Sequence, residues 1–318
     1  MNENLIDRRA YPEGLRLSRW RTADGWDHRR FDWPADDAKP ARGSMIFQAG
    51  RGDYFEKYIE TLDEWHRAGW NLRGFDWRGQ AGSGRFLTDP TVGHVESFDI
   101  WIEDFTLFLD AWLAETPGPH VVVAHSMGGH LVLRQLIEQR SAVDAVVLSA
   151  PMLEVSGRPL GQRLGRLLAR LCARIGWGDQ HAWQENERPS LPGSSRQRLL
   201  THCQDRYADE MDWIEQIPGI RIGPPSWQWL VAAFASSAKL FAPGLLERFD
   251  KPVLLIGAAQ DRLVNPDAIR RAAARLPDAQ LHMDRLSLHE VFREIDEIRT
   301  PIMKTIRRFL DEKAPAPR

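Results

Sequence analysis

The chain has little cysteine, no excess of positive charge and no long apolar run. Its 318 residues include only two cysteines, Cys172 and Cys203, too few for a disulfide scaffold or for a structural zinc site rich in cysteine. The 42 basic and 44 acidic side chains give a net charge of −2, which argues against nucleic-acid binding as the main activity. No apolar stretch of about 18 residues predicts a membrane span, and the first residues lack the apolar core of a secretory signal. We therefore expect a cytoplasmic protein.

The apolar residues that are present predict a globular α/β protein. Hydrophobic residues make up 43% of the chain, enough for a sizeable core. Residues 15–22 and 27–34 flank a turn and predict a β-hairpin. After residue 43, apolar runs alternate with segments of helical periodicity, which predicts a mostly parallel sheet with helices on both faces. Strands are expected at 44–50, 71–77, 120–126, 144–151, 251–261 and 279–286. Helices are expected at 53–68, 98–115, 129–140, 265–277 and 293–313.

This alternation stops near residue 152 and resumes at 251. Residues 152–248 combine helical patterns, Pro and Gly breaks, and five of the 13 tryptophans. We interpret them as a helical cap inserted between two strands, over a core made of residues 1–151 and 249–318. We expect this insertion to act as a lid over the core.

The sharpest chemical signal is A-H-S-M-G-G at 124–129. A predicted apolar strand leads into it and a predicted helix follows, which is the context of a nucleophile elbow. Such a tight turn needs small residues, here Ala124 and Gly128 on either side of Ser126. Ala124 stands where the motif usually has glycine. A serine before a helix is also a common N-cap, which is the structural alternative. In this context we predict that Ser126 is a nucleophile.

A serine nucleophile needs a base, and the base needs an orienting carboxylate. With an elbow of this kind the chain order is serine, acid, histidine. Asp261 follows a predicted buried strand, where open α/β sheets carry functional residues. Only His282 and His289 follow Asp261, and His282 lies inside a predicted strand. We predict a triad of Ser126, Asp261 and His289, with the pKa of His289 near its ordinary value of about 6.5.

Acyl transfer also needs two N–H donors for the developing oxyanion, each worth roughly 2.7–4 kcal/mol of barrier. One is expected to be the backbone N–H of Met127, directly after the nucleophile. The other is expected from Q-A-G-R-G at 48–52, where Gly50 and Gly52 let the backbone approach the substrate. The backbone N–H of Arg51 is the candidate. No G-K-[ST] follows, so the segment does not match a phosphate-binding loop.

Several further stretches follow the pattern of one known family. They are A-G-R-G-D-Y-F-E-K-Y (49–58), F-D-W-R-G-Q-A-G-S-G-R (75–85), G-H-V-E-S-F-D (93–99), L-T-H-C-Q-D-R-Y (200–207) and G-P-P-S-W-Q-W-L (223–230). With A-H-S-M-G-G, G-A-A-Q-D-R-L-V (257–264) and L-H-E-V-F-R-E (288–294), the chain resembles the α/β-hydrolases of the monoglyceride lipase and lysophospholipase L2 group, also catalogued as serine aminopeptidase-like hydrolases. Two departures from the pattern, Ala49 and Ala124, remove no required side chain or amide.

The resemblance implies an α/β-hydrolase fold with a helical cap. It implies a serine hydrolase that cleaves carboxylic esters of fatty-acyl lipids through an acyl-enzyme, with a lysophospholipase as the leading interpretation. A monoacylglycerol lipase or a general carboxylesterase is the alternative within this chemistry. No cofactor and no metal is expected, and the expected partner is a small lipid ester.

Two interpretations from other classes stay open. An aminopeptidase of the same fold would need cap carboxylates to hold a substrate ammonium. The candidates are Asp205, Asp209, Glu210, Asp212 and Glu215, although 203–215 is more simply a solvated helix face. A catalytically dead binding protein is the other alternative, and an intact triad argues against it.

Residues 160–177 predict a basic amphipathic helix within the cap. Its arginines, Arg163, Arg166, Arg170 and Arg174, share one face. Its apolar residues, Leu160, Leu164, Leu167, Leu168, Leu171 and Ile175, take the other. Such a helix either packs its apolar face on the core and covers an acyl pocket, or lies on an anionic membrane surface. The second option corresponds to peripheral attachment at the inner membrane face.

Overall fold

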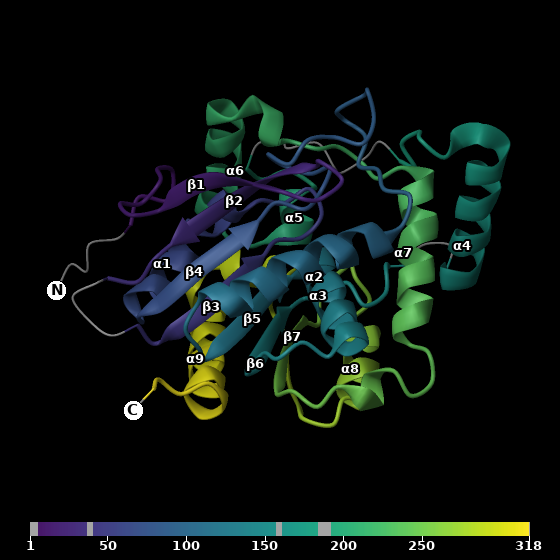
Figure 1. Cartoon of the computed structure of the whole chain (residues 1–318). Coiled ribbons are helices and arrows are strands. Elements are labelled where there is room, and N and C mark those ends of the chain that lie inside the picture. Colours follow the sequence, from purple (N-terminus) through teal and green to yellow (C-terminus); the bar gives the residue numbers. More distant parts are fainter. Residues whose placement is uncertain (1–5, 37–40, 157–160, 184–191, 318) are drawn as a thin grey trace.

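An eight-stranded sheet forms the centre of the molecule (Figure 1). The computed structural model describes residues 6–36, 41–156, 161–183 and 192–317. The strands are β1 (Arg16–Arg21), β2 (Asp27–Trp33), β3 (Gly43–Gln48), β4 (Trp70–Phe75), β5 (His120–His125), β6 (Ala145–Ser149), β7 (Val253–Ala258) and β8 (Ala279–Asp284). Their order across the sheet is β1-β2-β4-β3-β5-β6-β7-β8. The predicted hairpin is confirmed, because β1 pairs with β2 in antiparallel register.

The remaining strands run parallel from β4 to β8, while β2 joins β4 antiparallel. This mostly parallel sheet confirms the predicted architecture. The carboxyl ends of β5, β7 and β8 therefore lie at one edge, which is where open α/β sheets place ligand sites. The loops after these three strands carry Ser126, Asp261 and His289.

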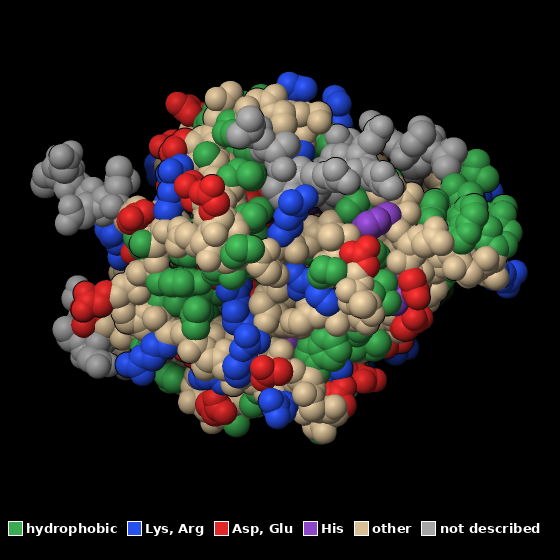
Figure 2. Space-filling view, turned by 90° about the horizontal axis from the view of Figure 1, so that it is seen from above, with side chains coloured by type: hydrophobic (Ala, Val, Ile, Leu, Met, Phe, Trp, Pro, Cys, Tyr) green, Lys and Arg blue, Asp and Glu red, His purple; other side chains and the backbone are tan. Residues whose placement is uncertain are grey.

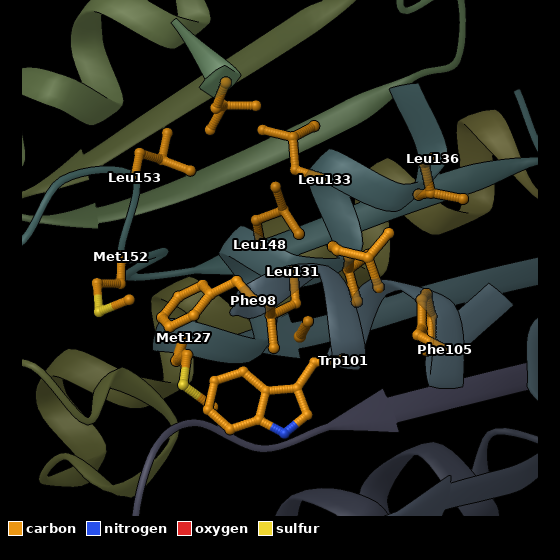
Figure 3. Close-up of a cluster of buried hydrophobic side chains, with 14 of the residues drawn as sticks. Phe98, Trp101, Phe105, Met127, Leu131, Leu133, Leu136, Leu148, Met152 and Leu153 are labelled. Atoms are coloured by element: carbon orange, nitrogen blue, oxygen red, sulfur yellow. The ribbon is translucent and has the colours of Figure 1, made fainter. Parts of the chain in front are cut away.

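Helices pack on both faces of the sheet. They are η1 (Phe55–Tyr58), α1 (Ile59–Arg67), α2 (Phe98–Glu115), α3 (Ser126–Gln139), α8 (Pro266–Ala273), η5 (Val291–Arg293) and α9 (Asp296–Lys313). Side chains alternate along β5, so Val122 joins the core under α2 and α3 while Val121 and Val123 join the core under α1 and α9. Figure 3 shows the first core, where Phe98 and Trp101 of α2 meet Met127 and Leu131 of α3.

The predicted helix at 129–140 begins three residues earlier, at Ser126. The strand before it correspondingly ends at His125. The predicted helix at 53–68 consists of a short 3-10 turn, η1, followed by α1. The first two differences arise because the turn between β5 and α3 is sharper than apolar periodicity can indicate.

The segment between β6 and β7 is mainly helical where the structure describes it. Its elements are α4 (Gly161–Cys172), η2 (Ala173–Trp177), α5 (Gln197–Leu200), α6 (Gln204–Gln216), η3 (Pro218–Ile220), α7 (Trp227–Leu240) and η4 (Leu246–Arg248). In Figure 1, α7 and α4 stand side by side at one end of the sheet, and α6 lies above β1 and β2. Parts of residues 152–248 fall outside the described residues.

Helix α4 packs on α7 through neither of its two predicted faces. Ala169 and Cys172 are buried in this contact, and a Cβ at Gly165 would lie 3.5 Å from Phe234. The leucine stripe, formed by Leu164, Leu167, Leu171 and Ile175, is 50–64% exposed. Figure 2 shows these hydrophobic side chains gathered over α4 at the edge of the molecule.

Of the two options for this helix, packing of the apolar face on the core is therefore contradicted for the leucine stripe, whereas Leu168, from the same predicted face, is half-buried. Small residues let α4 approach α7 closely, and the leucines are left beside the arginine stripe, which consists of the exposed Arg163, Arg166, Arg170 and Arg174. Leu160, expected on the leucine side, lies outside the described residues. Within the described part of the chain, no helix combines the length and apolar character needed to cross a membrane.

Candidate active site

Ser126 occupies a strained turn between β5 and α3. Its φ angle is 51°, a left-handed conformation that costs a non-glycine residue about 1–2 kcal/mol. The turn is possible because its neighbours are small. A Cβ at Gly128 would lie 2.4 Å from the carbonyl oxygen of Ala49, and Ala124 is fully buried. This conformation directs the serine hydroxyl away from the helix and toward the edge of the sheet.

The loops after β7 and β8 bring Asp261 and His289 to this hydroxyl. The Nε2 atom of His289 lies 2.9 Å from the Oγ of Ser126, and its Nδ1 lies 2.6 Å from the Oδ2 of Asp261. The other oxygen of Asp261 accepts hydrogen bonds from the backbone N–H groups of Leu263 and Val264, at 2.8 and 3.1 Å. The carboxylate is thus held in place while it orients the imidazole. The structure brings the three predicted triad residues together.

The alternatives for two of these residues do not match the geometry. Ser126 does not act as an N-cap: it is the first residue of α3, and its hydroxyl contacts His289 instead of a helix N–H. The residue before it, at the N-cap position, makes no side-chain cap either. His282 lies inside β8, where it pairs with Ile256 of β7. It belongs to the sheet rather than to the loop that reaches Ser126.

The segment 48–52 passes directly beside the nucleophile. A Cβ at Gly50 would lie 3.0 Å from the Cβ of Ser126, so glycine is needed for this close approach. The N–H of Gly50 donates to the Oδ2 of Asp53 at 3.2 Å, and that of Gly52 donates to the Oε1 of Gln80 at 2.6 Å. Arg51 lies between these two anchored residues. The backbone around both candidate oxyanion donors, Arg51 and Met127, is therefore held next to Ser126.

The charges around His289 change its pKa. Burial alone lowers the pKa, but the Asp261 carboxylate raises it by charge and hydrogen bonding, and Glu290 and Asp53 add to this effect. The balance raises the pKa of His289 above its ordinary value. This direction contradicts the expected pKa near 6.5, mainly because the charge and hydrogen bond of Asp261 outweigh the effect of burial.

A buried charge network supports the site and was not predicted. The Nζ of Lys57 lies 2.9 Å from the Oδ1 of Asp53 and 2.6 Å from the Oε1 of Glu290. It also lies 3.9 Å from Glu210 of α6, whose carboxylate pairs with Arg196 at 2.8 Å. We call Asp53, Lys57, Glu210 and Glu290 the Lys57 network. It connects the oxyanion segment, the loop of His289 and the helical segment between β6 and β7.

Asp53 is the member that reaches the oxyanion segment. Besides the N–H of Gly50, it accepts a 2.6 Å hydrogen bond from the hydroxyl of Tyr58. Burial raises the pKa of Asp53, but Lys57 and other partners outweigh burial and lower it to about 2, so the carboxylate stays ionised. The four-residue spacing of Asp53 and Lys57 was visible in the sequence. Their meeting with Glu290, more than two hundred residues away, was not.

His125 is a further residue of the site that the sequence analysis did not single out. Its ring packs 4.9 Å from that of His289 and also contacts Tyr58. Burial, with the neighbouring His289, lowers the pKa of His125 to about 4, so it is neutral near pH 7. Its neutral ring fills the space behind the triad without adding a competing positive charge.

One group of side chains in the described part of the chain has the spacing of metal ligands. Ligand atoms of His94, Glu96 and Asp179 lie within 4.8 Å of one another. His94 already contacts the hydroxyl of Ser226 at 2.9 Å and Glu96 at 3.2 Å, and both carboxylates are exposed. His94 is buried, and both of its ring nitrogens already have partners.

Two of the five cap carboxylates considered for an aminopeptidase are buried and engaged elsewhere. Asp209 binds Arg8 and Arg9 at 2.7 and 2.8 Å, and Glu210 binds Arg196. Both acids are buried, so the description of 203–215 as a solvated helix face is wrong at these two positions. The N-terminal arginines cover this face of α6.

Comparison with known proteins is consistent with the geometry. A family described as serine aminopeptidase, S33, matches residues 39–296. Lysophospholipase L2 of Escherichia coli is 28% identical over 225 residues, which cover 70% of this chain and 64% of that protein, so the match spans less than two thirds of that relative. Probable lysophospholipase L2 of Haemophilus influenzae is 24% identical over 276 residues, covering 85% of this chain and 84% of that protein.

The fold is also found in solved structures. A soluble variant of monoglyceride lipase from Saccharomyces cerevisiae, in complex with a substrate analog, has a TM-score of 0.76 at 17% identity and covers 96% of this chain and 97% of that one. Monoacylglycerol lipase from Paleococcus ferrophilus has a TM-score of 0.68 at 21% identity, covering 90% and 99%. At these identities the likeness concerns the fold, which is the α/β-hydrolase fold.

Proposed function

Because this chain belongs to the serine aminopeptidase S33 family of α/β-hydrolases, we propose that it hydrolyses carboxylic esters of fatty-acyl lipids with Ser126 as nucleophile. The observation that carries this proposal is the hydrogen-bonded chain from Ser126 through His289 to Asp261. It has the order and geometry that serine hydrolysis requires.

In this mechanism the Oγ of Ser126 attacks the ester carbonyl while its proton moves to Nε2 of His289. Asp261 orients the imidazole and stabilises its positive form. The backbone N–H groups of Arg51 and Met127 stabilise the oxyanion. The alcohol then leaves with the proton from His289 and an acyl-enzyme remains. Water attacks the acyl group and gives a proton to His289, which passes it to the Oγ of Ser126 as the fatty acid leaves.

Lysophospholipids are the substrate class that we favour. Relatives named lysophospholipase L2 match 70% and 85% of this chain. Monoacylglycerols and simple carboxylic esters require the same chemistry and are the alternatives. An aminopeptidase is disfavoured because Asp209 and Glu210 already bind arginines, which leaves them unable to hold a substrate ammonium without breaking buried ion pairs.

We further propose that residues 152–248 act as a cap over Ser126 and that α4 attaches it to an anionic membrane surface. The arginine stripe supplies charge complementary to anionic lipid, and the exposed leucine stripe beside it supplies the apolar face of an interfacial helix. This arrangement would bring the enzyme to the surface where lysolipids accumulate.

The reaction class is tested with a fluorophosphonate probe and a substrate panel. The probe should label the protein, and Ser126→Ala should abolish labelling and lower kcat by about 10⁶-fold. The panel compares a lysophospholipid, the monoacylglycerol with the same acyl chain, and an aminoacyl amide. Cleavage of the amide alone would replace ester hydrolysis with the aminopeptidase alternative. Esterase activity that persists in Ser126→Ala would remove this serine from the mechanism.

A further inference from the structure

A large open cavity lies where the loop after β4 meets the segment 217–224. Its volume is about 880 Å³, within the range of about 300–1,000 Å³ typical of small-molecule sites. One wall comes from residues 81–91 and the other from Ile217, Pro218, Ile220 and neighbouring residues. We call it the junction cavity, because it joins the sheet-bearing core to the segment between β6 and β7.

The described residues that line the junction cavity include four arginines and a histidine but no carboxylate. This is unusual for a chain with slightly more acidic than basic residues. Arg29 contributes little free charge, because it binds Asp76 at 2.6 Å and Glu56 at 2.5 Å. The excess positive charge therefore comes from Arg19, Arg85 and Arg221.

Arg85 forms part of the cavity wall, and its charge is not neutralised by any direct partner. Its Nε donates to Pro90, its Nη1 to Ala81 and Gly84, and its Nη2 to Gly219 and Arg221, all through backbone carbonyl oxygens at 2.6–3.2 Å. A guanidinium has five N–H donors, and all five are used. Burial without a carboxylate partner lowers the pKa of Arg85. Arg85 thus supplies positive potential and holds the two walls together, while direct contacts must come from other residues.

Arg221 is placed to make such contacts. Its side chain is exposed, and it lines both the junction cavity and a small cavity shared with Arg51 and Gly52. Its neighbours are attached to the oxyanion segment, since the carbonyl of Gly223 accepts a 2.9 Å hydrogen bond from Nη1 of Arg51. A Cβ at Gly52 would lie 3.0 Å from Ile222. Arg221 therefore stands between the cavity and the candidate oxyanion donor.

We propose that the junction cavity binds the phosphate of the lysophospholipid headgroup, with Arg221 and Arg19 as its direct contacts. The Arg19 side chain is 56% exposed, and its Nε lies 3.6 Å from the surface carboxylate of Asp27. Its Nη1 donates to the carbonyl oxygen of Gly82 at 2.8 Å, which leaves its Nη2 donors for a ligand. Arginine matches the geometry and charge of phosphate oxygens. The apolar wall formed by Ile217, Pro218 and Ile220 accommodates the uncharged part of the headgroup. This inference rests on the proposed function, because it assigns a headgroup to the ester that Ser126 cleaves.

The test uses Ser126→Ala protein and non-cleavable ether lipids, so that binding is measured without turnover. The ligands are an ether analogue of a lysophospholipid and the neutral alkylglycerol with the same chain, both below their critical micelle concentrations. Arg221→Gln should weaken binding of the phosphate-bearing lipid by about 10- to 100-fold and leave the neutral lipid unchanged. Arg221→Lys should restore part of the loss, and Arg19→Gln should give a smaller one. Arg248→Gln is the matched control, because Arg248 is an exposed arginine of the same segment that does not line the cavity.

Inorganic phosphate separates the two possible sources of the phosphate group. Competition between inorganic phosphate and the ether lysophospholipid, lost in Arg221→Gln, supports a phosphate site that the headgroup occupies. Phosphate binding that depends on Arg221, together with lipid binding that does not, overturns the headgroup assignment. Equal losses for the charged and neutral lipids also overturn it, since they indicate a general structural effect.

Failure of the proposed function gives a different result. If wild-type protein cleaves neither the lysophospholipid nor the monoacylglycerol, ester hydrolysis is excluded, whatever the ether lipids bind. If it cleaves both and Arg221→Gln does not change the ratio of their kcat/KM values, hydrolysis stands and the headgroup site is excluded.

Discussion

The edge of the sheet that carries the triad and the outer surface of α4 differ in whether their side chains have partners among the described residues. At the sheet edge, Ser126, His289 and Asp261 form a continuous hydrogen-bonded chain, and Lys57 lies between the carboxylates of Asp53 and Glu290. On α4, the leucine stripe and the arginine stripe face solvent. The first region is organised within the chain itself. The second is left uncovered by the described residues, which is the property that the proposed membrane attachment uses.

The largest effect that bears on this comparison is expected from Asp261→Asn. The substitution keeps the shape of the side chain but removes the charge that orients and stabilises the imidazolium, so kcat should fall by about 10⁴-fold. Ester hydrolysis and circular dichroism should be measured together, because the fold should be retained. Near-normal activity in a folded variant would mean that another carboxylate serves His289 and that the triad edge is less preorganised than its geometry indicates.

A smaller effect is expected from Lys57→Met, which removes the cation at the centre of the Lys57 network. Glu290 would keep its ion pair with Arg293, but Asp53 would remain buried with only neutral hydrogen-bond partners, so the free energy of unfolding should fall by about 3–5 kcal/mol. Urea denaturation measures this change. Lys239→Met is the control, since Lys239 pairs with Glu138 at 3.0 Å but is 51% exposed, and its loss should change stability by about 0–1 kcal/mol. Equal changes in both variants would show that the buried network has no special role.

The surface of α4 should respond in binding rather than in stability. Replacing Arg166 and Arg170 together with glutamine should weaken binding to anionic vesicles roughly 30-fold, at about 1 kcal/mol per arginine near the surface. Hydrolysis of a short soluble ester should be unaffected, because α4 contacts α7 through Ala169 and Cys172. Arg307→Gln with Arg308→Gln, on exposed positions of α9, is the matched control. Unchanged vesicle binding in the α4 variant would leave the exposed leucines without a lipid partner.

The smallest effect concerns pH. The proposed mechanism needs neutral His289, and the pKa of this residue is raised by Asp261, Glu290 and Asp53. The value of kcat/KM should therefore fall as the pH drops through a midpoint above about 6.5. The residual activity of Asp261→Asn should have a lower midpoint, because the largest raising charge is gone. A wild-type midpoint at or below 6.5 would contradict the charge distribution around the imidazole.

Much of the core was predictable because its signals are local. Buried parallel strands appear as apolar runs, and the helices between them have apolar side chains at helical spacing. The elbow at Ser126 could be predicted because a tight turn requires small neighbouring residues, here Ala124 and Gly128. Asp261 and His289 could be placed because each directly follows a strand, and all parallel strands end at the same edge.

The Lys57 network and the junction cavity could not be predicted in this way. Lys57 and Glu290 are separated by 233 positions. The Arg85 side chain donates to the backbone carbonyl of Arg221, which is 136 positions away. Nothing in either local sequence indicates the other. Which side of α4 packs on α7 could likewise not be predicted. The periodicity of α4 shows which residues share a side but not which side α7 covers.

The sequence by itself therefore determined the order of strands and helices, the elbow serine and the candidates for its acid and base. The tertiary structure decided which charges surround His289, which arginines remain without a carboxylate partner, and which face of α4 meets solvent. The physical reason is range. Backbone propensity and side-chain periodicity act over a few residues, whereas desolvation and charge pairing depend on which distant segments the fold brings within a few ångströms of one another.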